Sequence, residues 1–294
     1  MNYRTFEFID KVYLRYAPKY KGEEEEINTI ISLLASNEPC MISRFGSVEL
    51  QTLCLMKYWP LLNVFKSRTC RLIQNNAGFF PVTHSNLKRF YKLYKEDVKD
   101  MDLLITWRIE EFLFRDWLKK KDTVWKATID NFFSQKNPWT QVLANMKILV
   151  IHPFKETIEQ QYLIRDKIFE NPLALPEFKS LSIIKAVQSI AGNPVGFDSW
   201  FDALDWMKRE IEKQDFEIAL LGCGAYGMPL AAHIKRMGKK AVHMGGILQF
   251  LFGIKGKRFM ETPETKDYIN DYFVFPSEAD KPKDADKVEG GCYW

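Results

Sequence analysis

The sequence predicts an α/β fold, an open, mostly parallel, doubly wound (Rossmann-like) sheet with helices on both faces. Short apolar segments typical of buried strands alternate with longer amphipathic segments, which is the pattern of β-α-β units and of a parallel sheet. One predicted strand runs directly into the glycine-rich turn GCGAYG, at 222–227, and a helical segment follows. The 294 residues are enough for one large unit, so we expect a single domain over 1–294, with any sub-boundary near 130–145.

Three elements open the predicted fold. In segment 22–39, acidic residues precede an apolar stripe and Pro39 follows it, which predicts a helix whose macrodipole is complemented at its N-terminus. The apolar segment 40–45 predicts a short buried strand, and segment 47–59 predicts a second helix.

The later strands and helices alternate along the chain. We predict strands at 102–107, 147–154, 180–187, 216–223 and 240–245. We predict helices at 156–170, 199–214 and 225–238. Segment 60–100 indicates only a loop and one helix, and the polar segment 276–287 is typical of extended surface chain.

The composition is that of a globular protein, with 46% apolar and 27% charged residues and a formal net charge of +4. This small charge suits anionic small molecules or an acidic membrane surface and argues against a nucleic-acid partner. The five cysteines show no C-x-x-C spacing, which argues for a reducing compartment and against structural zinc. No apolar segment approaches the roughly 18 residues of a membrane span. We therefore expect a cytoplasmic protein, with peripheral association at the inner membrane face as the alternative.

The glycine-rich turn is suited to a phosphate. Gly222 permits a tight turn, Gly224 lets backbone N–H groups approach a ligand, and Gly227 lets the next helix pack on the strand. The N–H groups at the helix start, those of Ala225 and Tyr226, would then face an anion. A tight turn that binds no ligand is the alternative interpretation.

A dinucleotide site would also need an acidic residue about 20 positions after the glycine turn, at the tip of the next strand. That tip carries His243, and the turn belongs to the last β-α unit rather than the first. We therefore expect neither NAD nor FAD. Lys239 and Lys240 suit a 2′-phosphate, so NADP stays open as an alternative.

Polar residues follow four of the predicted strands. Because ligands of open α/β sheets bind beyond the carboxyl ends of the strands, we expect these residues to share one rim. They are Arg44, Ser47 and Glu49, then His152 and Lys155, then the glycine turn, and last His243, Gly245 and Gly246. Structural interpretations stay open: Glu49 can complement the dipole of a helix capped by Ser47, and both histidines can be hydrogen-bonded core residues.

Segment 245–259 begins with an apolar run and ends with cations. It is either a buried helix followed by a solvated basic loop, or a segment whose Lys255, Lys257 and Arg258 pair with diphosphate oxygens. A membrane-surface segment is the third interpretation.

A family resemblance rests on three segments: SRFGSVEL at 43–50, KILVIHPFKETIEQQ at 147–161 and FEIALLGCGAYGMPLAAHIKRMGKKAVHMGG at 216–246. In order, they resemble the R-[FY]-G-D-G-E segment, the mid-chain strand-loop-helix and the late small-residue loop of the GT-D type glycosyltransferases of bacterial surface-glycan synthesis. The resemblance spans most of the chain.

The resemblance implies transfer of a sugar from a nucleotide-sugar donor to a glycan or lipid-linked acceptor in polysaccharide or glycoconjugate synthesis. It places Arg44, Gly46 and Ser47 at the donor. The family's carboxylates form a metal-binding D-x-E, of which only Glu49 is present, because Ser47 stands at the Asp position. The late turn, His243-Met244-Gly245-Gly246, also departs from the family's Asp-Ile-Gly-His-like turn. We therefore expect Mn²⁺ or Mg²⁺ to be weakly bound or dispensable, with Glu49 as its protein ligand.

Sugar transfer needs hydrogen-bond donors for the diphosphate, cations for the leaving group, and a proton acceptor for the incoming hydroxyl. We expect Arg44 and Glu49 around the donor, the glycine turn on its phosphates, and His152 or Glu49 as proton acceptor. Two other functions stay open: an NADP-dependent oxidoreductase, and a non-catalytic subunit that binds a nucleotide sugar. The sequence does not define the oligomeric state.

Overall fold

The computed structural model describes residues 18–59, 66–281 and 290–294. A seven-stranded sheet crosses it in the order β3-β2-β1-β7-β6-β4-β5. Its strands are β1 (Met41–Ser43), β2 (Leu103–Thr106), β3 (Asp122–Trp125), β4 (Lys147–His152), β5 (Ser180–Lys185), β6 (Ile218–Leu221) and β7 (Lys240–His243). Every neighbouring pair is parallel, which confirms the predicted open, doubly wound α/β sheet.

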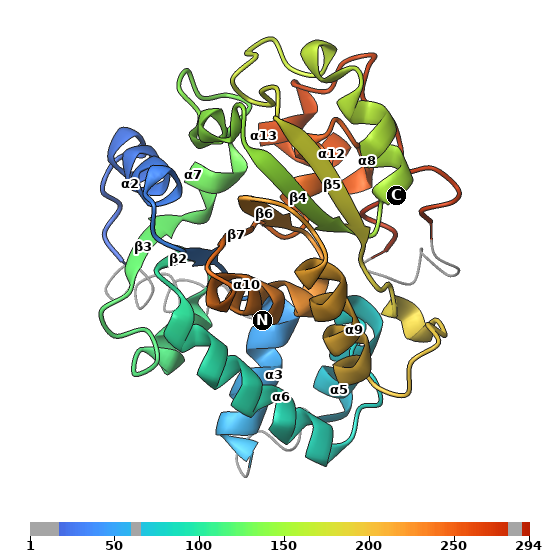
Figure 1. The fold of residues 1–294 in the computed structure, drawn as a ribbon. Helices are drawn as coiled ribbons and strands as arrows, with labels where there is room; N and C mark the ends of the chain where they lie inside the picture. The colour runs from blue at the N-terminus through green and yellow to red at the C-terminus, as the bar shows by residue number, and fades with distance from the viewer. Residues whose placement is uncertain (1–17, 60–65, 282–289) are drawn as a thin grey trace.

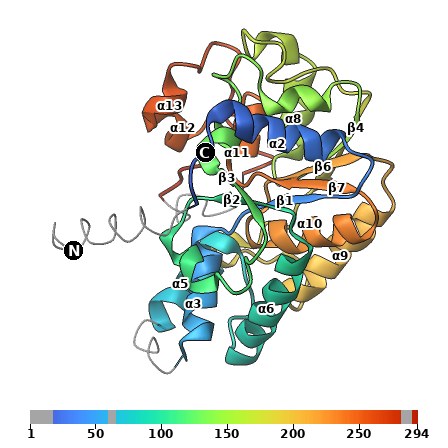
Figure 2. The same cartoon turned by 90° about the vertical axis from the view of Figure 1, so that its left-hand side faces the viewer.

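Helices cover both faces of the sheet, as Figure 1 and Figure 2 show. One face carries α3 (Ser47–Lys57), α5 (Lys66–Ala77), α6 (His84–Asp97), α9 (Trp200–Glu212) and α10 (Gly227–Arg236). The other carries α2 (Glu23–Ala35), α7 (Lys126–Asp130), α8 (Lys155–Tyr162), α11 (Ile247–Leu251), α12 (Lys257–Glu261) and α13 (Pro263–Lys266).

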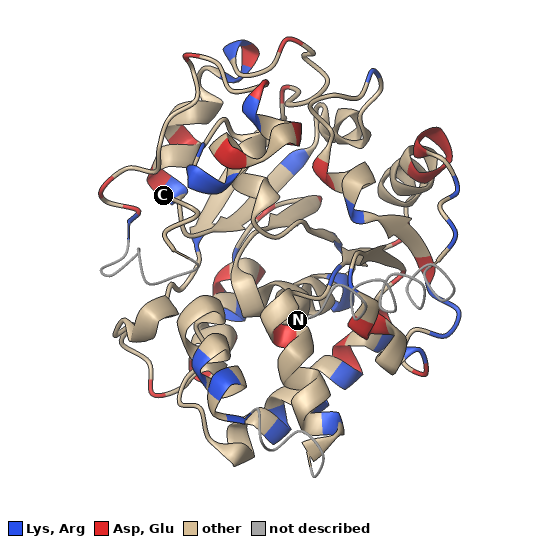
Figure 3. Cartoon of the chain, turned by 180° about the vertical axis from the view of Figure 1, so that it is seen from behind, with Lys and Arg blue, Asp and Glu red and all other residues tan. Residues whose placement is uncertain are grey.

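The strands separate two apolar cores, one on each face. Successive side chains of a strand point to opposite faces, and in β4 Leu149 and Ile151 join one core while Ile148 and Val150 join the other. All four are buried. Lys and Arg as well as Asp and Glu are found on the helices of both layers (Figure 3), in keeping with the small net charge.

Most predicted elements are present, within narrower bounds. The edge strand β3 is not among the predicted strands, and 66–97 forms two helices, α5 and α6, instead of one. The α-helix expected at 156–170 ends at Tyr162. Gly46 is the N-cap of α3, so the interpretation of Ser47 as the cap is wrong. The expected basic loop is also wrong in part, because Lys257 begins α12.

The order of the strands opens a crevice near the middle of the sheet. From β1 the chain proceeds outward to β2 and β3, whereas from β4 it proceeds to β5 at the other edge, and β6 and β7 then fill the gap. Such a reversal of direction leaves room for a ligand beyond the carboxyl ends of the strands. Within the described ranges, no helix has the length and apolar character to span a bilayer.

Candidate functional site

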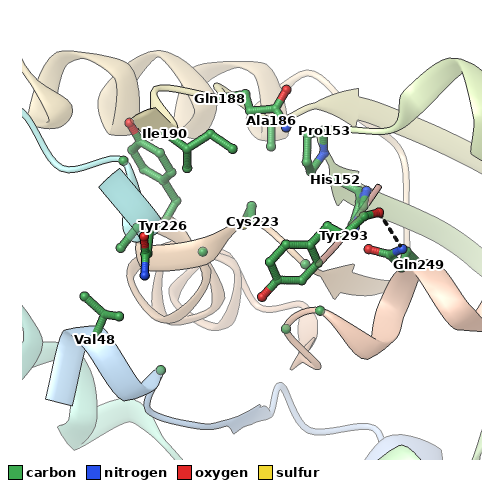
Figure 4. Close-up of a pocket in the computed structure, with 18 of the residues that line it drawn as sticks. Val48, His152, Pro153, Ala186, Gln188, Ile190, Cys223, Tyr226, Gln249 and Tyr293 are labelled. Atoms are coloured by element: carbon green, nitrogen blue, oxygen red, sulfur yellow. Dashed lines mark hydrogen bonds between the residues drawn. The ribbon is translucent and has the colours of Figure 1, made fainter. Parts of the chain in front are cut away.

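A cavity of about 330 Å³ lies at the carboxyl ends of the strands. This volume is at the lower end of the range of about 300–1,000 Å³ for small-molecule sites. The segments that follow β1, β2, β4, β5, β6 and β7 all line the cavity, together with Tyr293 and Trp294 near the C-terminus. Figure 4 shows part of this lining, with Pro153, Cys223 and Tyr293 among the labelled residues. The cavity therefore lies where the strand-end rule places a ligand.

The structure brings most of the predicted site residues to this cavity. Its lining includes Arg44, Gly46, Ser47, Glu49, His152, Gly222, Gly224, Tyr226, His243, Gly245, Gly246 and Arg258. Four predicted residues are outside this lining: Ala225, Lys155, Lys255 and Lys257.

Each of those four has another environment. The carbonyl of Ala225 accepts a hydrogen bond from the Tyr94 hydroxyl at 2.8 Å. Lys155 lies 3.8 Å from Glu159. Lys257 lies 4.0 Å from Glu261, and the Lys255 ammonium lies 5.2 Å from the centre of the Phe275 ring.

Arg44 is a buried cation whose guanidinium is oriented by three neighbouring groups. Its guanidinium carbon lies 4.5 Å from the centre of the Trp107 ring, and its Nη1 donates to the carbonyl of Met244 at 3.3 Å. The Oδ1 atom of Asp130 lies 4.0 Å from the same nitrogen. Burial lowers the pKa of Arg44, and Asp130 opposes that shift. An arginine nevertheless stays protonated in proteins, so the cavity has a fixed positive charge.

A second guanidinium lies at the same glycine turn. A Cβ on Gly245 would lie 3.7 Å from Nη1 of Arg44, and a Cβ on Gly246 would lie 3.3 Å from Nη1 of Arg258. Gly245 has a φ of +72°, which favours glycine. Arg44 has Asp130 beside it, whereas Arg258 forms no ion pair with any residue that the structure describes. Two guanidiniums therefore lie at this turn, and Asp130 offsets only the charge of Arg44 directly.

Glu49 brings a carboxylate into the cavity from the first turn of α3. It is buried, with 6% of its surface exposed. A Cβ on Gly46 would overlap the carboxylate group, so the glycine leaves room for Glu49 to fold back over the start of the helix. The position of the carboxylate thus depends on the absence of a side chain at Gly46.

The two buried histidines are neutral. The Nδ1 atom of His152 accepts a hydrogen bond from the backbone N–H of Phe154 at 3.1 Å, which assigns the ring proton to Nε2. Burial lowers the pKa of His152 to about 3 and that of His243 to about 3. His243 lies against the hydroxyl of Ser43 at 3.2 Å, and a Cβ on Gly227 would overlap its ring. Gly227 therefore lets α10 pack closely on β7.

Two glycines of the glycine turn have different surroundings. A Cβ on Gly222 would lie 2.7 Å from Cδ2 of His152 and 2.9 Å from the carbonyl oxygen of Gly245, so only glycine fits. Gly224 has a φ of +56°, and the nearest atom to its Cβ position is 3.8 Å away, so space remains there. Burial raises the pKa of the Cys223 thiol between them, which makes that cysteine a poor nucleophile. Phosphate binding by this turn stays a prediction.

Several lining residues were not predicted: Trp107, Gln188, Ser189, Gln249 and Tyr293. Trp107 follows β2 and Gln188 follows β5, so the strand-end rule would find both if it were applied to those two strands. Tyr293 reaches the cavity only through tertiary packing, and its sequence neighbourhood contains no signal for a site.

Among the residues that the structure describes, the side chains do not by themselves form a metal site. Within the described ranges, no cluster of three or more His, Cys, Asp or Glu side chains could hold an ion. Hard divalent cations need about six oxygen ligands, and the predicted pair supplies one carboxylate, from Glu49, and one hydroxyl, from Ser47. These residues therefore do not fit a resident cation.

The cations that suggested NADP lie away from the cavity. Lys240 begins β7, at the opposite edge of the sheet, and its Nζ donates to the carbonyl of Leu34 at 2.7 Å. Lys239 donates to the carbonyl of Phe216 at 2.8 Å. Neither lysine lines the cavity, so neither is placed to bind a 2′-phosphate there.

Comparison with known proteins gives one structural likeness. No family model matches the chain, and no curated protein matches it. A solved structure described as selenomethionine-substituted domain of unknown function 1792 aligns at 13% identity, over 77% of this chain and 83% of that chain, with a TM-score of 0.41. The function is therefore inferred from the cavity and its residues.

Proposed function

We propose that the chain is a glycosyltransferase that binds a nucleotide sugar in this cavity and transfers its sugar to a glycan or lipid-linked acceptor. The observation that carries the proposal is the pair Arg44 and Arg258 on the Gly245–Gly246 turn, with the carboxylate of Glu49 in the same cavity. Two guanidiniums suit the charge and geometry of a diphosphate. A carboxylate beside them weakens anion binding, which points to a chemical role for Glu49.

In this proposal the two arginines stabilise the leaving group. The bond between the anomeric carbon and the diphosphate oxygen breaks, and its electron pair stays on the diphosphate. Arg44, already oriented by Asp130, Trp107 and the Met244 carbonyl, needs little reorganisation to meet the developing charge. Arg258 supplies the second cation.

Glu49 is the proton acceptor that the geometry favours. The acceptor's hydroxyl oxygen forms the new bond to the anomeric carbon, and its proton passes to the carboxylate. His152 is a poor base at neutral pH, because its pKa is lowered to about 3 and its Nδ1 already accepts a hydrogen bond. Its Nε2–H is suited instead to donate a hydrogen bond to the ligand.

The resemblance of segment 43–50 to the R-[FY]-G-D-G-E segment supports the same assignment. Bacterial surface-glycan synthesis belongs to the proposal through that resemblance alone. A cytoplasmic location and contact with the inner membrane face belong to it through the composition and through the basic residues of segment 245–259. We further propose that Mn²⁺ or Mg²⁺ is weakly bound or dispensable, because Ser47 stands where the family has Asp.

A thermal-shift screen tests the proposal. The panel contains UDP, GDP, CMP and dTDP, their common sugar conjugates, and NADPH. A nucleotide-sugar site is supported if the nucleotide and the sugar conjugates of one base raise the melting temperature of wild type, and if this rise is smaller in Arg44→Met. A response to NADPH alone would overturn it. Donor binding without release of nucleoside diphosphate in the presence of acceptor glycans would favour the non-catalytic subunit.

A further inference from the structure

Tyr293 and Trp294 line one side of the cavity, and residues 292–294 are hydrogen-bonded to α12 and α11. The backbone N–H of Arg258 donates to the carbonyl of Cys292 at 3.0 Å, and that of Lys257 donates to the carbonyl of Trp294 at 3.4 Å. The side-chain amide of Gln249 donates to the carbonyl of Tyr293 at 3.3 Å (Figure 4). The start of α12 is thus capped by this segment.

Two glycines allow the segment to come this close. A Cβ on Gly256 would lie 2.7 Å from the carbonyl carbon and oxygen of Tyr293. A Cβ on Gly246 would lie 2.8 Å from Cε1 of the Tyr293 ring. The ring therefore packs over the backbone of Gly246, and Figure 4 shows that it points into the cavity.

The hydroxyl of Tyr293 lies at the arginine pair. Its oxygen is 3.5 Å from the Cβ position of Gly246, and Nη1 of Arg258 is 3.3 Å from that same point. Arg44 is close enough for its pKa to be influenced by Tyr293 as well as by Arg258. Three hydrogen-bond donors from distant parts of the chain, two guanidiniums and one phenol, therefore converge on the Gly245–Gly246 turn.

We propose that Tyr293 is a ligand-binding residue whose hydroxyl donates a hydrogen bond to the diphosphate bound by Arg44 and Arg258. The proposal rests on the proposed function, because it takes a diphosphate as the anion. A phenol donates to phosphate oxygens without adding charge, so Tyr293 adds a directed hydrogen bond to a site that already has two guanidiniums. Packing of residues 292–294 against α12 then completes the anion site. This packing requires glycine at position 256, where a Cβ would contact the carbonyl group of Tyr293.

The test is isothermal titration with inorganic pyrophosphate, the part shared by all nucleoside diphosphates. We expect Tyr293→Phe, which removes only the hydroxyl, to raise the dissociation constant about tenfold, the usual effect of one hydrogen bond to a charged group. Gly256→Ala, which displaces the segment, is expected to weaken binding at least as much. Tyr272→Phe is the matched control, because Tyr272 is 45% exposed and outside the cavity, and its constant is expected to stay within about twofold of wild type.

The outcomes separate this inference from the proposed function. If wild type binds pyrophosphate and Tyr293→Phe binds it equally well, the role of Tyr293 is overturned while the arginine site stands. If wild type shows no binding at millimolar pyrophosphate, both the arginine site and the role of Tyr293 are overturned.

Discussion

Replacing Arg258 by methionine tests the arginine pair with the least disturbance of the fold. Methionine keeps most of the length of the side chain and removes its charge. Arg258 lines the cavity, lies at the Gly246 turn and forms no ion pair with the residues described, so its charge is available to a ligand. Arg44, by contrast, lies 4.0 Å from Asp130.

The expected loss follows from one charge-assisted hydrogen bond, worth about 1.5–3 kcal/mol. Two unit charges about 4 Å apart interact by about 4 kcal/mol at an effective dielectric constant near 20, and desolvation of the charges offsets part of this. We therefore expect Arg258→Met to raise the dissociation constant of UDP or GDP, whichever binds, by about tenfold to a hundredfold.

The matched control is Lys257→Met, which removes the same charge from the preceding residue of α12. Lys257 lies beside Glu261 and outside the cavity, so its variant is expected to bind within about twofold of wild type. Titration calorimetry at about 150 mM salt, where exposed charges are screened beyond about 8 Å, measures both constants. Equal weakening by the two variants would show a net-charge effect, and no weakening by either would refute the arginine site.

Three further predictions address the carboxylates and the metal. Gly46→Ala is expected to fold with a near-native melting temperature, because Gly46 has ordinary extended backbone angles. The new Cβ displaces the Glu49 carboxylate, so turnover is expected to fall about tenfold or more. Native turnover would show that the carboxylate need not be held there. Burial raises the pKa of Glu111 from 4.5 to about 7, so its contribution to stability is complete below pH 4.5 and is lost as pH rises through about 7. The unfolding free energy of wild type relative to Glu111→Gln is therefore expected to fall by about 3 kcal/mol between pH 4.5 and 8 in denaturant titrations, and a pH-independent difference would contradict this. EDTA is expected to leave most of the wild-type transfer activity. The Ser47→Asp variant is expected to bind Mn²⁺ more tightly than wild type in calorimetry. Complete loss of wild-type activity in EDTA that Mn²⁺ reverses would show that the metal is required.

Much of the sheet could be predicted because its inner strands are apolar throughout. All residues of β6 are buried, and its apolar run ends at a glycine turn that marks the boundary. The edge strand β3 could not be predicted in this way, because only Val124 of its four residues is buried and the segment contains no apolar run. Its pairing with β2 depends on the fold of the rest of the sheet.

The site was predictable to the extent that it follows strand ends. Arg44 directly follows the parallel strand β1, and His152 is the last residue of the parallel strand β4. The topology of the sheet alone therefore brings both residues to one rim. Side-chain direction on the flanking helices is set by packing instead, which is why Arg258 lines the cavity and its neighbour Lys257 does not. Tyr293 follows α13 by more than 20 residues in the sequence, so only the folded chain reveals its place.

The most direct test of the account compares wild type with Glu49→Gln in donor binding and in release of nucleoside diphosphate. The substitution keeps the size of the side chain and removes its capacity to accept a proton. With the nucleotide sugar identified by the thermal-shift screen, we expect donor affinity to be retained or increased and turnover to fall about a hundredfold or more. Turnover equal to wild type, or no nucleotide sugar bound by wild type, would contradict the central claim that this cavity is the site of sugar transfer.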